Sequence, residues 1–323
     1  MIQTIGIIGL GSIGRRHARI IHTFFKDVDL YAYRTKKGAL GEAPTYIQEI
    51  GEKEFYKKRF DLAIISNPSS LHFPTLKKII TNHAANSVFV EKPFCLPNEV
   101  DECKSLIRKE DVAVYPGNSL RFHPAVQILK NIMREGRLGE AVECIAHAGS
   151  SMPGWHPYED YRTSYASQKK MGGGVLLTSI HEIDLVCHLF GHSELFASYI
   201  NNVVLNDIDV EDVAHLLIKS KKCSISNVSL NFFQQPYRRY LEVAFEYGSF
   251  LWNFDNDYVT VADAHDGKKQ QTPIDAEVDT MYNAMWEEIF SGSSRQNLFE
   301  LASVFNSLEL ISSAIHHSHD HKF

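Results

Sequence analysis

The stretch TIGIIGLGSIG, residues 4–14, decides the fold of this chain. An apolar, β-branched run from Thr4 to Ile8 leads into three glycines spaced as G-x-G-x-x-G, and a helical pattern follows through Phe25. In such a loop the first glycine permits a tight turn, the second lets the backbone approach a pyrophosphate, and the third allows close helix–strand packing. The stretch therefore predicts a dinucleotide-binding fold. The residues predicted to hold the phosphates are Gly9, Gly11, Ser12, Ile13 and Gly14.

Four further apolar runs, at residues 28–33, 61–66, 88–90 and 112–115, alternate with helical patterns. This alternation is typical of a doubly wound parallel sheet, so we expect a Rossmann domain over residues 1–120. One face of its first helix is expected to carry Ile13, His17, Ile20, Ile21 and Phe24.

The run at residues 28–33 ends in Tyr33-Arg34-Thr35-Lys36-Lys37, with three cations and no acid. A fold that prefers NAD usually has an acidic side chain here for the ribose 2′-hydroxyl. Arg34 and Thr35 suit a 2′-phosphate instead, which favours NADP over NAD. The alternative is a solvated basic loop.

The other strand ends carry further candidate residues, because ligands of open α/β sheets bind beyond the carboxyl ends of the strands. The tripeptide Glu91-Lys92-Pro93 places a lysine at such an end, and the proline stops the strand there. The remaining candidates for cofactor binding are Asn67, Pro68, His72 and Asn118.

Composition excludes several classes of protein. The formal net charge of -6 argues against nucleic-acid binding. The five cysteines form no C-x-x-C pair, which indicates reduced thiols in a cytoplasmic protein. We expect no membrane-spanning segment, no signal peptide and no catalytic metal, and we interpret the histidine-rich tail as a polar terminus.

From Val142 onward short β-like runs dominate, and they predict an α+β domain over residues 121–323 with a large open, mostly antiparallel sheet. A helical pattern over 281–315 is expected to close the chain. The β-like runs cover residues 142–148, 203–205, 213–218, 224–231, 240–245 and 250–252.

The segment from Trp155 to Arg162 is the most distinctive part of this domain. Aromatic faces with a few directed polar groups suit a sugar ring, and Arg162 has the fork that binds a carboxylate or phosphate. The alternative is an aromatic loop packed under its own helix. The substrate candidates in the segment are Trp155, His156, Tyr158, Tyr161 and Arg162.

Several motifs in this order resemble the Gfo/Idh/MocA family of NAD(P)-dependent sugar and cyclitol oxidoreductases. They are the glycine fingerprint, Asn67-Pro68 with His72, Glu91-Lys92-Pro93, Asn118, Arg121-Phe122-His123-Pro124, Gly136-Arg137-Leu138-Gly139, and Gly172-Gly173-Gly174 with His181 and Asp184. The aromatic segment resembles a subgroup linked to surface-sugar biosynthesis. The resemblance implies an N-terminal Rossmann domain and a C-terminal domain whose open sheet face builds homo-oligomers.

The resemblance also implies site residues. It places Lys92 and His181 near the nicotinamide and the reacting hydroxyl, as oxyanion stabiliser and proton acceptor. Many members carry an aspartate where this chain has Thr178, so the usual acid is missing here. Arg121, Thr178 and Asp184 are further substrate candidates, and Asp184 lies one helical turn after His181.

The predicted activity is hydride transfer between nicotinamide and a secondary hydroxyl or keto carbon of a sugar, cyclitol or nucleotide-sugar. Two rivals remain. One is a catalytically inactive NAD(P)-bound sensor or partner-binding protein of the same fold. The other is an enzyme that holds NAD as a catalytic carrier, as some family glycosidases do.

Overall fold

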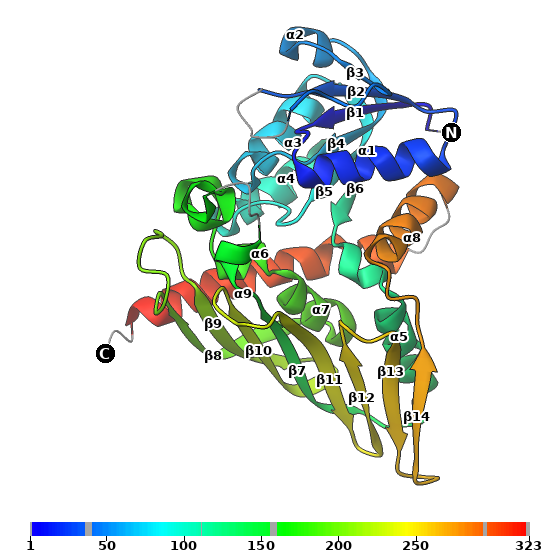
Figure 1. Ribbon diagram of the computed structural model, residues 1–323, viewed down its shortest axis with the longest axis vertical. Helices are drawn as coiled ribbons and strands as arrows, with labels where there is room; N and C mark the ends of the chain where they lie inside the picture. Colours follow the sequence, from blue (N-terminus) through cyan, green and yellow to red (C-terminus); the bar gives the residue numbers. More distant parts are fainter. Residues whose placement is uncertain (1, 36–40, 111, 156–159, 293–295, 321–323) are drawn as a thin grey trace. The chain divides into compact units, whose positions relative to one another are not determined.

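The computed structural model describes residues 2–35, 41–110, 112–155, 160–292 and 296–320, which divide into two compact units (Figure 1). The domain boundary near residue 120 stays a prediction. Unit 1 comprises Met1–Asn118, Lys170–Gly172 and Tyr282–Phe299, and unit 2 comprises Ser119–Lys169, Gly173–Met281 and Glu300–Phe323.

Unit 1 is built on a six-stranded, wholly parallel sheet in the order β3-β2-β1-β4-β5-β6. This is the strand order of dinucleotide-binding folds, and the order reverses between β1 and β4. Its central strands are almost continuously apolar because both faces of a parallel sheet are covered. The strands are β1 (Thr4–Ile8), β2 (Asp29–Tyr33), β3 (Ile47–Glu49), β4 (Phe60–Ile65), β5 (Ala85–Glu91) and β6 (Ala113–Gly117).

Helices fill the crossovers between these strands. On the predicted face of α1, His17, Ile20 and Ile21 are buried, and Phe24 is 54% exposed. Phe24 is the last residue of α1, so its side chain lies at the end of the helix. The helices are α1 (Ser12–Phe24), α2 (Glu52–Phe55), α3 (His72–Thr81), α4 (Val100–Glu110) and, starting in unit 2 and continuing in unit 1, α8 (Val278–Ser291).

Unit 2 is built on an eight-stranded sheet in the order β14-β13-β12-β11-β7-β10-β9-β8. Only the β7–β10 pair is parallel, so the predicted mostly antiparallel sheet and the two-part α/β fold class are confirmed. The strands are β7 (Ala141–Gly149), β8 (Ser193–Asn201), β9 (Val213–Ser220), β10 (Cys223–Asn231), β11 (Arg238–Phe245), β12 (Gly248–Asn253), β13 (Tyr258–Asp263) and β14 (Lys268–Pro273).

One predicted strand of unit 2 is wrong. Residues 203–205 form an irregular loop, because the backbone N–H groups of all three donate to the buried carboxylate of Asp212 at 2.7–2.9 Å. These donors are therefore not available to a sheet.

The predicted helical pattern over 281–315 corresponds to two helices, α8 and α9, with the short helical turn Gln296–Phe299 between them. Helix α8 ends at Ser291, and Gly292 follows with φ at +60°. A second helix, α9, lies along β8 in unit 2 (Figure 1). The helices of unit 2 are α5 (Pro124–Glu135), α6 (Val175–Thr178), α7 (His181–Phe190) and α9 (Leu301–Asp320).

No single helix in the described ranges is long and apolar enough to cross a membrane. The bent pair Lys169–Thr178 and His181–Phe190 passes that test only when taken together, by length and composition. Eight of the ten residues of α7 are buried. All five cysteines are buried free thiols.

Candidate functional site

The glycine loop joins β1 to α1 in unit 1, and its geometry leaves one side open. Gly9 has φ at +96°, and a Cβ on Gly14 would lie 2.1 Å from the Gly9 carbonyl oxygen. Around Gly11, in contrast, an added Cβ would meet nothing within 4 Å. The N–H groups of the first turn of α1 are the natural donors to a phosphate on that open side. The loop therefore fits the pyrophosphate of a dinucleotide.

Two guanidinium groups converge where β2 ends. Arg34 donates to the Gly41 carbonyl at 2.7 Å and to Glu49 Oε2 at 3.1 Å. Arg15, in the first turn of α1, donates to the same Gly41 carbonyl at 2.7 Å. Lys36 and Lys37, from the predicted basic run, lie outside the described residues. Paired arginines beside this strand end suit a phosphate ester.

Asn67, Lys92 and Asn118 follow the neighbouring strands β4, β5 and β6, so all three lie at one edge of the sheet. The Oδ1 atoms of Asn67 and Asn118 are buried without a hydrogen-bond partner among the described residues. A buried acceptor normally has a partner. These two amide oxygens therefore fit a bound molecule that brings N–H or O–H donors, as the carboxamide and ribose of a nicotinamide nucleotide do.

His72 and Glu91, both predicted at the cofactor, are buried within unit 1. The ring nitrogens of His72 lie 2.6 Å from the Pro93 carbonyl and 2.8 Å from the Asn67 carbonyl. Burial lowers the pKa of His72 from its ordinary value, and the ring lies between the two carbonyl groups and so connects the two loops. Glu91 contacts His17 and the Lys92 backbone. Their contact with a cofactor stays a prediction.

Thr178 and His181 belong to unit 2, on either side of a break between two helices. Thr178 is the last residue of α6 and His181 the first of α7, and both are half-buried. The glycine run before α6 packs closely, because a Cβ on Gly174 would lie 2.3 Å from a carboxylate oxygen of Glu211. Burial raises the pKa of Glu211 to about 7.

Arg121 and Asp184 form a buried ion pair in unit 2. Arg121 donates to both carboxylate oxygens of Asp184, at 2.5 and 2.8 Å, and also to the Glu300 carbonyl and the Ser303 hydroxyl. The exposed fractions of the two residues are 0% and 1%. The pair anchors α7 to the start of α9, and its predicted contact with substrate stays a prediction.

The aromatic segment is anchored locally at the positions that the structure describes. Trp155 packs edge-on against Phe232 with ring centroids 5.1 Å apart, and its indole N–H donates to Ser150. Tyr161 donates to Asp207 at 2.6 Å. Arg162 pairs with its near neighbour Asp160. His156 and Tyr158 lie outside the described residues.

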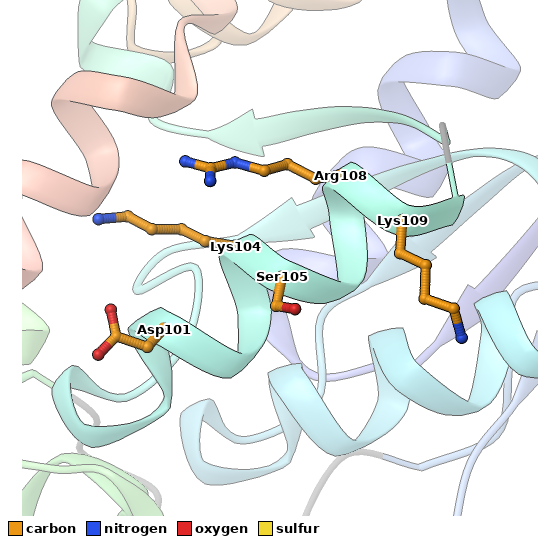
Figure 2. Close-up of a pocket in the computed structure, with 5 residues that line it drawn as sticks. All are labelled: Asp101, Lys104, Ser105, Arg108 and Lys109. Atoms are coloured by element: carbon orange, nitrogen blue, oxygen red, sulfur yellow. The ribbon is translucent and has the colours of Figure 1, made fainter.

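A shallow pocket lies on α4 (Figure 2). Lys104 and Arg108 extend to one side of the helix and Lys109 to the other, so its cations do not converge on one point. Among the described residues no group of three or more His, Cys, Asp or Glu side chains is arranged to hold a metal ion.

Sequence reasoning missed Arg15, Trp286 and Glu211. Arg15 directly follows the last glycine of the fingerprint. Its position in the first turn of a phosphate-binding helix could therefore have identified it as a candidate. The Trp286 indole N–H donates to His17, and the Glu211 carboxylate accepts the Leu176 N–H. Both partners are distant in the sequence, and no local pattern identifies them.

Known proteins resemble this chain over most of its length. A family model for the "Oxidoreductase family, NAD-binding Rossmann fold" matches residues 3–117, and one for the "GFO/IDH/MocA C-terminal domain" matches residues 126–251. A 2,7-anhydro-N-acetylneuraminate hydratase from Escherichia coli is 27% identical over 58% of this chain and 49% of its own length. A myo-inositol 2-dehydrogenase from Thermotoga maritima is 27% identical over 60% of this chain and 57% of its own length. The match thus spans about half of these curated relatives.

A solved structure shares the fold. The WlbA dehydrogenase from Bordetella pertussis, in complex with NADH and UDP-GlcNAcA, superposes with a TM-score of 0.79 at 16% identity. The superposition covers 99% of this chain and 97% of that one.

Proposed function

The chain belongs to the GFO/IDH/MocA family of oxidoreductases, and from this premise we propose that it oxidises or reduces a sugar-like substrate with NAD(P). The reaction is hydride transfer at a secondary hydroxyl or keto carbon of a sugar, cyclitol or nucleotide-sugar. The proposal rests on one observation, which is the set of groups found at one edge of the parallel sheet in unit 1. There an open glycine loop, two unsatisfied amide oxygens and Lys92 occur together.

The bound nicotinamide supplies or accepts the hydride, and the protein handles the proton and the charge. His181 takes the hydroxyl proton during oxidation and returns it during reduction, since an imidazole titrates near neutral pH. Lys92 stabilises the negative charge that develops on the substrate oxygen. Thr178 has a hydroxyl that can position the substrate, but it has no carboxylate, so the proton chemistry rests on His181 and Lys92.

We favour NADP as the cofactor. Arg34 and Arg15 meet at one carbonyl beside the end of β2, and Thr35 follows Arg34. Glu49, which pairs with Arg34, is an acid on the neighbouring strand and is the feature that favours NAD instead. Two cations against one acid make a 2′-phosphate the better fit.

The substrate proposal rests on the family and on the aromatic segment of unit 2. One dehydrogenase relative acts, by its name, on myo-inositol, and the solved neighbour holds a nucleotide-sugar. Trp155 offers an anchored aromatic ring that suits a sugar face. The substrate is therefore a sugar, cyclitol or nucleotide-sugar.

We also propose that the chain forms a homo-oligomer through the open face of the eight-stranded sheet. Tyr199 on β8 and Leu217 on β9 are 51% and 37% exposed, and Phe196 nearby on β8 is 73% exposed. Large exposed apolar side chains on one sheet are a feature of interaction surfaces. Analytical ultracentrifugation of wild type and Leu217→Lys measures the assembly directly.

The test of the activity uses Lys92→Met and His181→Ala, with Lys109→Met and His192→Ala as matched controls, because the side chains of Lys109 and His192 are 80% and 70% exposed. Sugars, cyclitols and nucleotide-sugars are screened by the change in nicotinamide absorbance, and NADPH binding is measured by fluorescence. We expect both site variants to bind NADPH and to lose about a hundredfold or more in turnover, while the controls keep theirs. Full activity in both site variants contradicts the assignment.

A specific observation favours a second function. One relative is named a hydratase, and hydration involves no net oxidation. A cofactor that remains bound through purification, with no net change in absorbance as substrate is consumed, favours an enzyme that uses the nucleotide as a carrier. Cofactor binding without any conversion favours the inactive sensor.

A further inference from the structure

Three side chains in unit 1 form a continuous hydrogen-bonded chain that ends at Lys92. The indole Nε1–H of Trp286 donates to His17 Nδ1 at 3.1 Å. His17 Nε2 lies 2.8 Å from Glu91 Oε1. The other carboxylate oxygen of Glu91 accepts the backbone N–H of Lys92 at 3.1 Å. The chain therefore links α8, α1 and the end of β5.

The chemistry of the donors fixes the state of the histidine. An indole N–H can only donate, so His17 Nδ1 must accept and carries no proton. The ring is therefore neutral, and its single proton is on Nε2, which donates to Glu91. The hydrogen bonds of this chain therefore all point the same way: Trp286 donates to His17, and His17 donates to Glu91.

We propose that His17 and Trp286 are positioning residues for Lys92 and act through the Glu91 carboxylate. The inference rests on the proposed function for the role of Lys92, but the geometry stands without it. Glu91 is 5% exposed and His17 is 0% exposed, so water does not compete for this carboxylate. His17 holds one oxygen of the Glu91 carboxylate. The other oxygen therefore stays within hydrogen-bond distance of the Lys92 backbone N–H and fixes the backbone from which the Lys92 side chain extends.

Packing alone is the competing explanation. The ring of His17 also lies edge-on to Phe89, Tyr282 and Trp286, with centroids 5.1–5.8 Å apart. A phenylalanine at position 17 keeps an aromatic ring there and removes the donor. A glutamine keeps a donor for Glu91 and an acceptor for Trp286. These two variants therefore separate hydrogen bonding from packing.

The experiment follows the Lys92 backbone amide by NMR-detected hydrogen exchange in protein labelled on lysine nitrogen. The Lys92 signal is assigned from its loss in Lys92→Met. We expect exchange to speed up by about tenfold in His17→Phe and in Trp286→Phe, the effect of losing one charge-assisted hydrogen bond, and to stay near wild type in His17→Gln. Tyr282→Phe is the matched control, because Tyr282 packs on His17 without a place in the chain, and it should not change the exchange.

Two further readouts decide the interpretation. NADPH affinity should stay within about threefold of wild type in His17→Phe, while turnover of any substrate found for the wild type falls by about tenfold with little change in KM. The proposal is wrong if Lys92 exchange is unchanged in His17→Phe, or if lysine amides elsewhere in unit 1, such as Lys77 and Lys78, speed up equally. Failure of the wild type to convert any sugar overturns the proposed function but leaves the exchange result to judge this inference.

Discussion

Replacing Glu211 by glutamine should stabilise unit 2 at alkaline pH and much less at acidic pH. The carboxyl group lies at the start of α6, where Oε1 accepts the Leu176 N–H at 3.1 Å and presses against Gly174. Desolvation by burial raises its pKa to about 7, although the hydrogen bond and Lys169 act in the opposite direction. A glutamine keeps an acceptor oxygen for Leu176 and carries no charge at any pH.

The magnitude follows from linkage. The rise from 4.5 to about 7 corresponds to about 3 kcal/mol, at 1.36 kcal/mol per unit of pKa. Because the folded-state pKa is raised, the folded state favours the protonated acid, and this stability is present below the unfolded pKa and lost as pH rises through about 7. Between about pH 5.5 and 8.5 the wild type should lose about 2 kcal/mol from this group, and Glu211→Gln should not.

The assay is urea unfolding at these two pH values, followed by tryptophan fluorescence. In a Trp286→Phe background the remaining tryptophans, Trp155 and Trp252, both belong to unit 2 and report on it alone. Glu194→Gln is the control, since the side chain of Glu194 is 78% exposed. A stability difference between Glu211→Gln and its parent that is the same at both pH values would show that the Glu211 carboxyl does not titrate in this range with a raised pKa.

Two further predictions concern the dinucleotide. Arg34→Ser should lower the affinity for 2′-phospho-ADP-ribose relative to ADP-ribose by about tenfold or more, measured by calorimetry, because a charge-assisted bond to the phosphate is lost. Arg59→Ser is the control, since Arg59 bonds Asn86, and an unchanged ratio in Arg34→Ser counts against NADP. Gly14→Ala should cost about 3 kcal/mol of stability or more, because its methyl group would lie 2.1 Å from the Gly9 carbonyl oxygen. Gly11→Ala should fold like wild type and bind ADP-ribose about tenfold more weakly, and equal stability of the two alanine variants would contradict the loop geometry.

The sequence predicted the parts of the fold that local patterns determine. The glycine loop between strand and helix was sufficient for unit 1, and alternating apolar runs located β7 and β9 to β12. Strand β14 has the sequence KKQQTP and is exposed along almost its whole length, so no apolar periodicity marks it. Its lysines are typical of an edge strand. Strand β3 is only three residues long.

Residues of the candidate site could be predicted where they belong to a short sequence motif. They could not be predicted where their position depends on a partner that is distant in the sequence. Lys92 and the glycines come from short motifs. His17 and Trp286 are 269 positions apart, and Arg121 and Asp184 are 63 apart. Both pairs form only after their elements pack. The spacing placed Asp184 one helical turn after His181, but it could not identify Arg121 as the partner of the Asp184 carboxylate.

The two predicted catalytic residues share one structural device. Lys92 directly follows the buried carboxylate of Glu91, and His181 directly precedes the buried carboxylate of Glu182, which accepts from Arg239 at 2.6 Å. Burying a carboxylate costs desolvation energy that the interaction with its partner often only offsets, so net stability does not explain either buried carboxylate. We infer that each carboxylate, held by its partner, restrains the backbone beside a residue that is predicted to handle a proton or a charge. On this inference the positioning of Lys92 and His181 depends on their sequence neighbours, whose own partners come from distant parts of the chain.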